Sequence, residues 1–130
     1  MGIFDLFKKK EPLTEEQKLN KLWDMWADGK VTSPCAALMT YESEVNNGGH
    51  SQYFFNVANT GDLKAAVAAV LTVLPEPLRS NLRRGYEAFA AQESIDDDVN
   101  DDLFGECDDV FYEHEQLLID LIQGYANELS

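Results

Sequence analysis

Apolar residues recur every three or four positions along most of the chain, and no stretch shows the strict alternation of a half-buried strand. Thr14-Glu-Glu-Gln17 is a capping box, in which Thr14 and Gln17 satisfy free backbone amides at a helix start. A single apolar face then follows at helical spacing as far as Gly29: Leu19, Leu22, Trp23 and Trp26. This periodicity predicts an all-α fold.

Further start and stop signals divide the rest of the chain. Ser33 is a candidate N-cap before Pro34, and Pro75 stops an alanine-rich helix. The expected helices after Gly29 cover residues 35–45, 52–57, 63–74, 78–89 and 108–125, with an acidic loop at 94–102. At 130 residues, the chain is long enough for one core. We therefore expect a single compact domain of five to seven helices over residues 14–130, with an acidic C-terminal third.

Residues 1–13 are expected to form a separate amphipathic N-terminal segment. Residues 1–10 place four large apolar side chains beside three lysines, but the apolar run is too short for a secretory signal and the charge follows it. Packing on the domain or on a partner is favoured over weak membrane contact by residues 1–10. Cys35 and Cys107 form no close motif and are typical of thiols in a reducing cytoplasm, and no run of roughly 18 apolar residues is present. A cytoplasmic protein is therefore expected.

Charge is distributed unevenly along the chain. Residues 1–84 contain ten acidic and ten basic residues, whereas residues 85–130 contain fourteen acidic residues and no Lys or Arg, which accounts for the net charge of −14. Direct binding to nucleic acid is disfavoured, because phosphate contacts require clustered Lys and Arg. A basic protein partner is the natural complement of such a segment.

The Asn-Asn-Gly-Gly run at 46–49 interrupts the helical pattern between two helices. Asn and Gly tolerate the left-handed backbone that closes a helix, so we expect positive φ at Gly48 and Gly49. Gln52 and Asn56 are one turn apart and are expected to bond the backbone of this turn. A folding role is therefore predicted for this segment.

The same segment resembles the signature of a bacterial family, the DNA-mimic proteins, in which an acidic residue precedes Asn-Gly-Gly-Phe, Gln, an aromatic pair and Asn. The matching residues here are Glu44, Asn47, Gly48, Gly49, His50, Gln52 and Asn56, with His50 in place of the phenylalanine. The resemblance implies an α-helical domain, often a homodimer, with no assigned catalysis. The family takes its name from a member that is regarded as presenting carboxylates as DNA presents phosphates, to a DNA-binding transcription factor. Because the shared motif is not the acidic surface, this function does not follow from the motif and depends on the charges of this chain.

The acidic segment is the candidate partner-binding surface. Carboxylates held on a fixed scaffold attract the cationic groove of a protein that grips phosphate. The candidate partner-binding residues are Asp96, Asp97, Asp98, Asp101, Asp102, Glu106, Asp108, Asp109 and Glu113. Two further interpretations stay open: a solvated surface that only confers solubility, and an immunity or antitoxin protein that neutralises a cationic nuclease.

The sequence gives weaker support to metal binding and to catalysis. Residues 98–109 offer oxygens at EF-hand-like spacing, but Leu103 stands where such a loop needs glycine, so we expect no metal site. No catalytic or cofactor motif stands out, and no cofactor is expected. The alternative from a different class is an enzyme or small-ligand binder built around Glu44, His50, Gln52 and Asn56.

Overall fold

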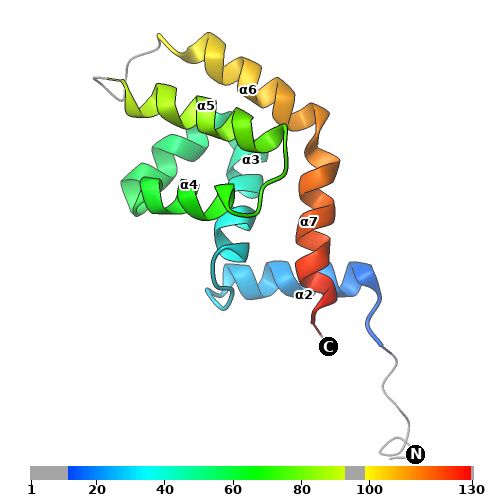
Figure 1. Cartoon of the computed structure of the whole chain (residues 1–130). Helices are drawn as coiled ribbons and strands as arrows, with labels where there is room; N and C mark the ends of the chain where they lie inside the picture. Colours follow the sequence, from blue (N-terminus) through cyan, green and yellow to red (C-terminus); the bar gives the residue numbers. More distant parts are fainter. Residues whose placement is uncertain (1–11, 93–98, 130) are drawn as a thin grey trace, which may run out of the picture.

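A computed structural model describes residues 12–92 and 99–129, and these residues form six helices and no strand (Figure 1). The helices are α2 (Glu15–Ala27), α3 (Cys35–Thr60), α4 (Leu63–Leu71), α5 (Leu78–Ala90), α6 (Asp101–Glu113) and α7 (Glu115–Asn127). The prediction of a single all-α domain of five to seven helices is confirmed. Among the described residues, no helix is both long enough and apolar enough to cross a membrane.

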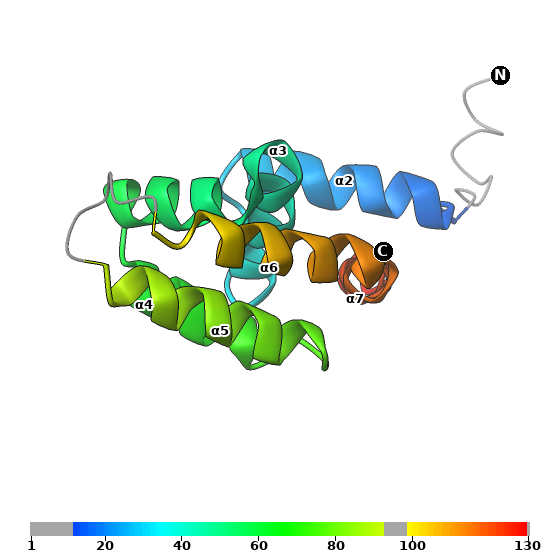
Figure 2. The ribbon, with the colours of Figure 1, turned by 90° about the horizontal axis from the view of Figure 1, so that it is seen from above.

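Helix α3 is the central element of the fold. It contacts α4, α5, α6 and α7, while α2 packs across α7 near the C-terminus (Figure 1). Seen from above, α5 and α6 lie alongside one another (Figure 2). Large side chains without exposed surface fill the space where these helices meet: Tyr41, Tyr53, Phe54, Phe111, Leu38, Leu74, Leu78, Leu82 and Leu118.

The capping box at the start of α2 forms as predicted. Gln17 N donates to Thr14 Oγ1 over 3.1 Å, and Thr14 N donates to Gln17 Oε1 over 2.9 Å. The expected Ser33 cap is wrong. Pro34 is the N-cap of α3, and its side chain has no oxygen that could accept a backbone N–H.

The segment 35–60 carries the single label α3, but it consists of two helical stretches, 35–47 and 50–60, that meet at a sharp kink. The two helices expected at 35–45 and 52–57 are therefore present, and each extends two or three residues further than predicted. Only Gly48 (φ −158°, ψ 18°) and Gly49 (φ 79°, ψ −178°) leave helical geometry inside α3. Positive φ is therefore confirmed at Gly49 and wrong at Gly48. The kink redirects the chain without a loop, because helical hydrogen bonding resumes at once on either side.

The helix expected from 108 to 125 is two helices that begin earlier. α6 starts at Asp101, inside the region expected to be an acidic loop, and His114 separates it from α7. His114 is half-buried at this junction, and Leu117 is exposed, although it follows the apolar spacing that predicted a helix over residues 108–125. The break lets α6 cover α3 and α5 while α7 turns to meet α2.

Candidate functional site

The kink in α3 brings backbone close to α6. A Cβ on Gly49 would lie 2.5 Å from Asp108 Oδ2, and Gly49 also has the positive φ that L side chains rarely adopt. A Cβ on Gly48 would collide with the side chain of Gln52. Glycine is therefore required at position 49 for backbone conformation and space together, whereas a side chain at position 48 would require only that the Gln52 side chain move.

His50, the first residue after the kink, is fully buried and hydrogen-bonded at both ring nitrogens. Its Nε2 lies 2.6 Å from Tyr41 Oη, and its Nδ1 lies 2.7 Å from Asp108 Oδ1, which also accepts the His50 backbone N–H over 2.7 Å. Burial raises the pKa of Tyr41 well above its ordinary value, so the phenol keeps its proton. With the imidazole proton on Nδ1, Tyr41 donates to His50 and His50 donates to Asp108. This Tyr41–His50–Asp108 chain ties both halves of α3 to α6.

Glu44 organises a second polar group across the kink. Its Oε2 accepts hydrogen bonds from Asn56 Nδ2 (2.8 Å) and Gln52 Nε2 (3.2 Å). The expectation that Gln52 and Asn56 bond the turn backbone is thus wrong: both amides bind a carboxylate from the first half of the helix. The charged acceptor is the stronger partner for an amide. Asn47, the remaining residue of the motif, is exposed.

A pair of carboxylates meets between α3 and α7. Asn46 Nδ2 donates to Glu42 Oε1 over 2.6 Å and to Glu115 Oε2 over 2.7 Å. Burial, the hydrogen bond to Glu115 and the charge of Glu115 together raise the pKa of Glu42 to about 7, against a smaller opposing effect of Asn46. Glu42 therefore holds its proton well above the pH at which an ordinary glutamate loses it.

The predicted partner-binding residues differ in their placement. Asp96, Asp97 and Asp98 lie outside the described residues. The remaining exposed carboxylates belong to α6: Asp101, Asp102, Glu106, Asp109 and Glu113. Asp108 is the exception, with a side chain only 27% exposed and held by His50.

Four of these residues form one line, which we call the acidic stripe: Asp102, Glu106, Asp109 and Glu113. Their spacing of four, three and four positions keeps them within about 60° of arc on a helix of 3.6 residues per turn. The buried residues of α6, Phe104, Cys107 and Phe111, occupy the opposite side. The acidic stripe therefore faces away from the core, along the length of α6.

One cation lies beside the acidic stripe. Arg84 of α5 reaches Glu106 Oε2 at 2.7 Å, and both side chains are more than half exposed. Such surface pairs contribute little to stability. The EF-hand-like spacing falls on helix α6 from Asp101 onward, which is not the irregular loop that calcium requires.

Sequence reasoning identified His50 and Asp108 but not their pairing, and it missed Tyr41, Glu42, Asn46 and Glu115 as members of the polar groups. The sequence did contain a signal for the pairing of His50 with Asp108. His50 stands where the resembling family has phenylalanine, and a buried histidine requires hydrogen-bond partners. Asp108 follows Cys107, which faces the core, so it is the acidic residue of α6 nearest the buried side.

Fold and site together define a small acidic all-α protein whose polar groups hold a carboxylate-bearing helix on its core. Residues 34–128 match the DMP19-like protein family. The chain therefore belongs to this family, a family of DNA-mimic proteins. No curated protein and no solved structure shows significant similarity to the chain.

Proposed function

We propose that the acidic stripe of α6 binds the phosphate-gripping groove of a DNA-binding protein and so competes with DNA for it. The observation that carries this proposal is the alignment of Asp102, Glu106, Asp109 and Glu113 on the solvent side of one helix. Membership of a DNA-mimic family supports the same assignment. The protein acts in this role by binding, without catalysis.

The charge density of the acidic stripe is similar to that of a DNA strand. From residue 102 to residue 113 the helix advances about 16 Å, at 1.5 Å per residue. Four carboxylates in that distance compare with roughly five phosphates along one strand of B-DNA, at 3.4 Å each. The carboxylates of α6 alone can therefore supply most of the negative charge that a groove for consecutive phosphates binds.

The position of α6 on the fold adds to this match. The hydrogen bonds of Asp108 to His50, and the 3.2 Å bond from Tyr112 Oη to Val45 O, hold α6 against α3. Asn81 Nδ2 of α5 also donates to Cys107 O over 2.8 Å, at a buried point. Carboxylates on a fixed helix lose less conformational entropy on binding than those on a flexible tail.

Arg84 gives the proposal a test in the opposite direction. It competes with any partner cation for Glu106, since the two side chains already form an ion pair. Removing the Arg84 charge frees Glu106, so that all four carboxylates of the acidic stripe can bind a partner. Arg84→Gln is therefore expected to strengthen partner binding. Neutralising the acidic stripe is expected to weaken it.

The experiment is capture of partners from the native cytoplasm on immobilised protein, followed by elution with double-stranded DNA or with polyglutamate at equal charge. A DNA mimic predicts release by DNA at a lower charge concentration than by polyglutamate. The stripe variant Asp102→Asn, Glu106→Gln, Asp109→Asn and Glu113→Gln should lose capture, most strongly at low salt. A control removes four exposed carboxylates elsewhere, through Asp24→Asn, Asp28→Asn, Glu87→Gln and Glu128→Gln, and should retain it.

The outcomes separate the interpretations. Equal capture by the stripe variant and the control variant would show that the acidic surface is only solvated, and the proposal would fail. Elution by polyglutamate as readily as by DNA would indicate a general acidic binder and not a mimic. Capture of a nuclease whose cleavage the protein inhibits would favour an immunity or antitoxin role.

A further inference from the structure

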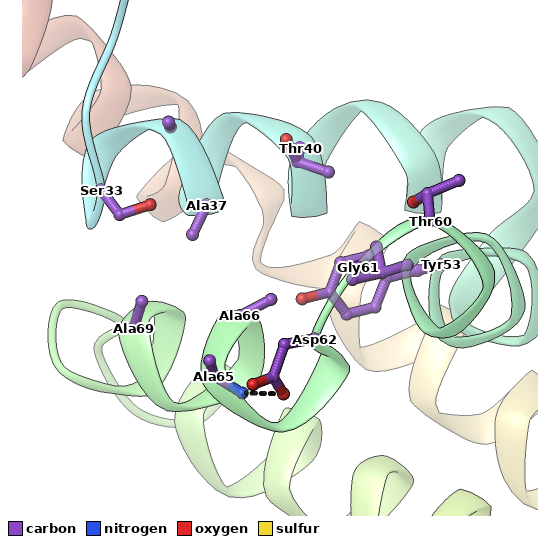
Figure 3. A pocket seen from close by; sticks show the side chains of 12 residues that line it. Ser33, Ala37, Thr40, Tyr53, Thr60, Gly61, Asp62, Ala65, Ala66 and Ala69 are labelled. Carbon is purple, nitrogen blue, oxygen red and sulfur yellow. Dashed lines mark hydrogen bonds between the residues drawn. The ribbon is translucent and has the colours of Figure 1, made fainter.

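A cavity of about 450 Å³ lies between α3 and α4, away from the acidic stripe. Its wall is built from small side chains on both helices and a few hydroxyls at its edge: Ser33, Ala36, Ala37, Thr40, Tyr53, Val57, Thr60, Gly61, Asp62, Ala65, Ala66 and Ala69. Figure 3 shows Ala66 and Ala69 of α4 facing Ala37 of α3 across the open space. The volume is within the range of sites that hold small organic molecules.

Tyr53 of α3 forms part of the wall of this cavity, with its hydroxyl directed toward Ala66 (Figure 3). The residue has no exposed surface, and its hydroxyl has no hydrogen-bond partner in the described structure. Leaving a buried hydroxyl unpaired costs about 1–3 kcal/mol. A phenylalanine would fill the same space without that cost, so the hydroxyl at this position points to a group that enters the cavity.

The surroundings define the chemistry of that group. Burial raises the pKa of Tyr53, so its hydroxyl stays protonated and can donate a hydrogen bond. No Lys or Arg lines the cavity, and the Asp62 carboxylate already accepts the Ala65 backbone N–H over 3.1 Å as the cap of α4. The remaining surface is mainly alanine methyl groups.

We propose that the α3–α4 cavity binds a small uncharged organic molecule, with an acceptor oxygen hydrogen-bonded to Tyr53 and an apolar body against the alanines of both helices. This site lies on different elements from the acidic stripe. It is therefore independent of the DNA-mimic proposal, and either can fail alone.

The test uses two probes of similar shape, acetophenone and ethylbenzene, which differ in a carbonyl group. Each is titrated into the ¹⁵N-labelled full chain, and backbone amide shifts are followed by NMR. We expect saturable shifts at cavity residues such as Ala37 and Ala66. The affinity should be roughly three- to tenfold higher for acetophenone, because only its carbonyl can accept the Tyr53 hydrogen bond.

Three variants make the result specific. Tyr53→Phe should reduce acetophenone affinity to that of ethylbenzene while leaving the melting temperature equal or higher. Ala66→Leu fills the cavity and should abolish binding of both probes, whereas Ala68→Leu, at an exposed position of α4 outside the cavity, should leave binding intact. Absence of saturable shifts at the cavity, or an unchanged acetophenone affinity in Tyr53→Phe, would overturn the proposal.

Discussion

Asp108 and Asp109 are adjacent on α6, yet they belong to two different regions of the molecule. Asp108 faces inward, where it accepts two hydrogen bonds from the buried His50. Asp109 faces outward, as part of the acidic stripe. The difference teaches that a run of carboxylates is not one functional unit. A rotation of about 100° per residue decides which carboxylate holds the fold and which meets a partner.

The inward region should be most sensitive at Gly49. Gly49→Val places a β-branched residue at φ 79° and drives its Cβ into the Asp108 carboxylate, so we expect a loss of about 2–4 kcal/mol of folding free energy. Gly48→Val should cost less, since its φ of −158° is not left-handed and only the flexible Gln52 must move. Chemical denaturation of both variants measures the difference. Equal costs would mean that the kink does not depend on the left-handed residue.

The two neighbouring carboxylates provide the most direct comparison. Asp108→Ala leaves the His50 backbone N–H and Nδ1 without their acceptor in a buried place, and it should cost about 2–3 kcal/mol. Asp109→Ala should change stability by no more than about 0.5 kcal/mol, as expected for an exposed position. Urea melts of the two variants test this. If both variants unfold like the parent, the Tyr41–His50–Asp108 chain does not stabilise the fold.

Glu42 extends the comparison to pH. Like Asp108 it is partly buried, and its raised pKa makes its charge change near neutral pH. Its folded pKa of about 7 is raised above the ordinary 4.5. The resulting stabilisation is fully present below pH 4.5 and is lost as pH rises through 7. In Glu42→Gln this loss is absent, so the melting temperature of the variant relative to the parent should increase between pH 4.5 and pH 8. A difference that stays constant with pH would show that Glu42 titrates normally.

The outward region should show the smallest effect on stability. Replacing the four carboxylates of the acidic stripe by amides relieves like-charge repulsion and removes only the weak Arg84–Glu106 pair. We expect a melting temperature equal to or slightly above that of the parent, with unchanged helicity by circular dichroism. A clear loss of stability would show that the acidic stripe stabilises the fold and is not a surface free for binding.

The parts of this protein that the sequence predicted correctly are those governed by neighbours in the chain. The Thr14–Gln17 capping box and the positive φ at Gly49 are both present in the structure. The break between α6 and α7 at His114 was not predicted, because the apolar spacing continues through this position without a proline or glycine. The Ser33 cap was predicted wrongly because the N-cap of α3 is the next residue, Pro34, which makes no side-chain cap hydrogen bond.

The amino-acid sequence by itself determined that this protein is helical and that its C-terminal third is acidic, because helix caps and periodicity depend on residues three or four positions apart. The tertiary structure alone decided what the polar residues do. His50 and Asp108 are 58 positions apart, and Asn46 and Glu115 are 69 apart, so no local pattern specifies either pair. The packing of α6 and α7 on α3 brings them together. The same packing leaves Asp102, Glu106, Asp109 and Glu113 in solvent, because the opposite side of α6 carries the apolar residues that the core buries.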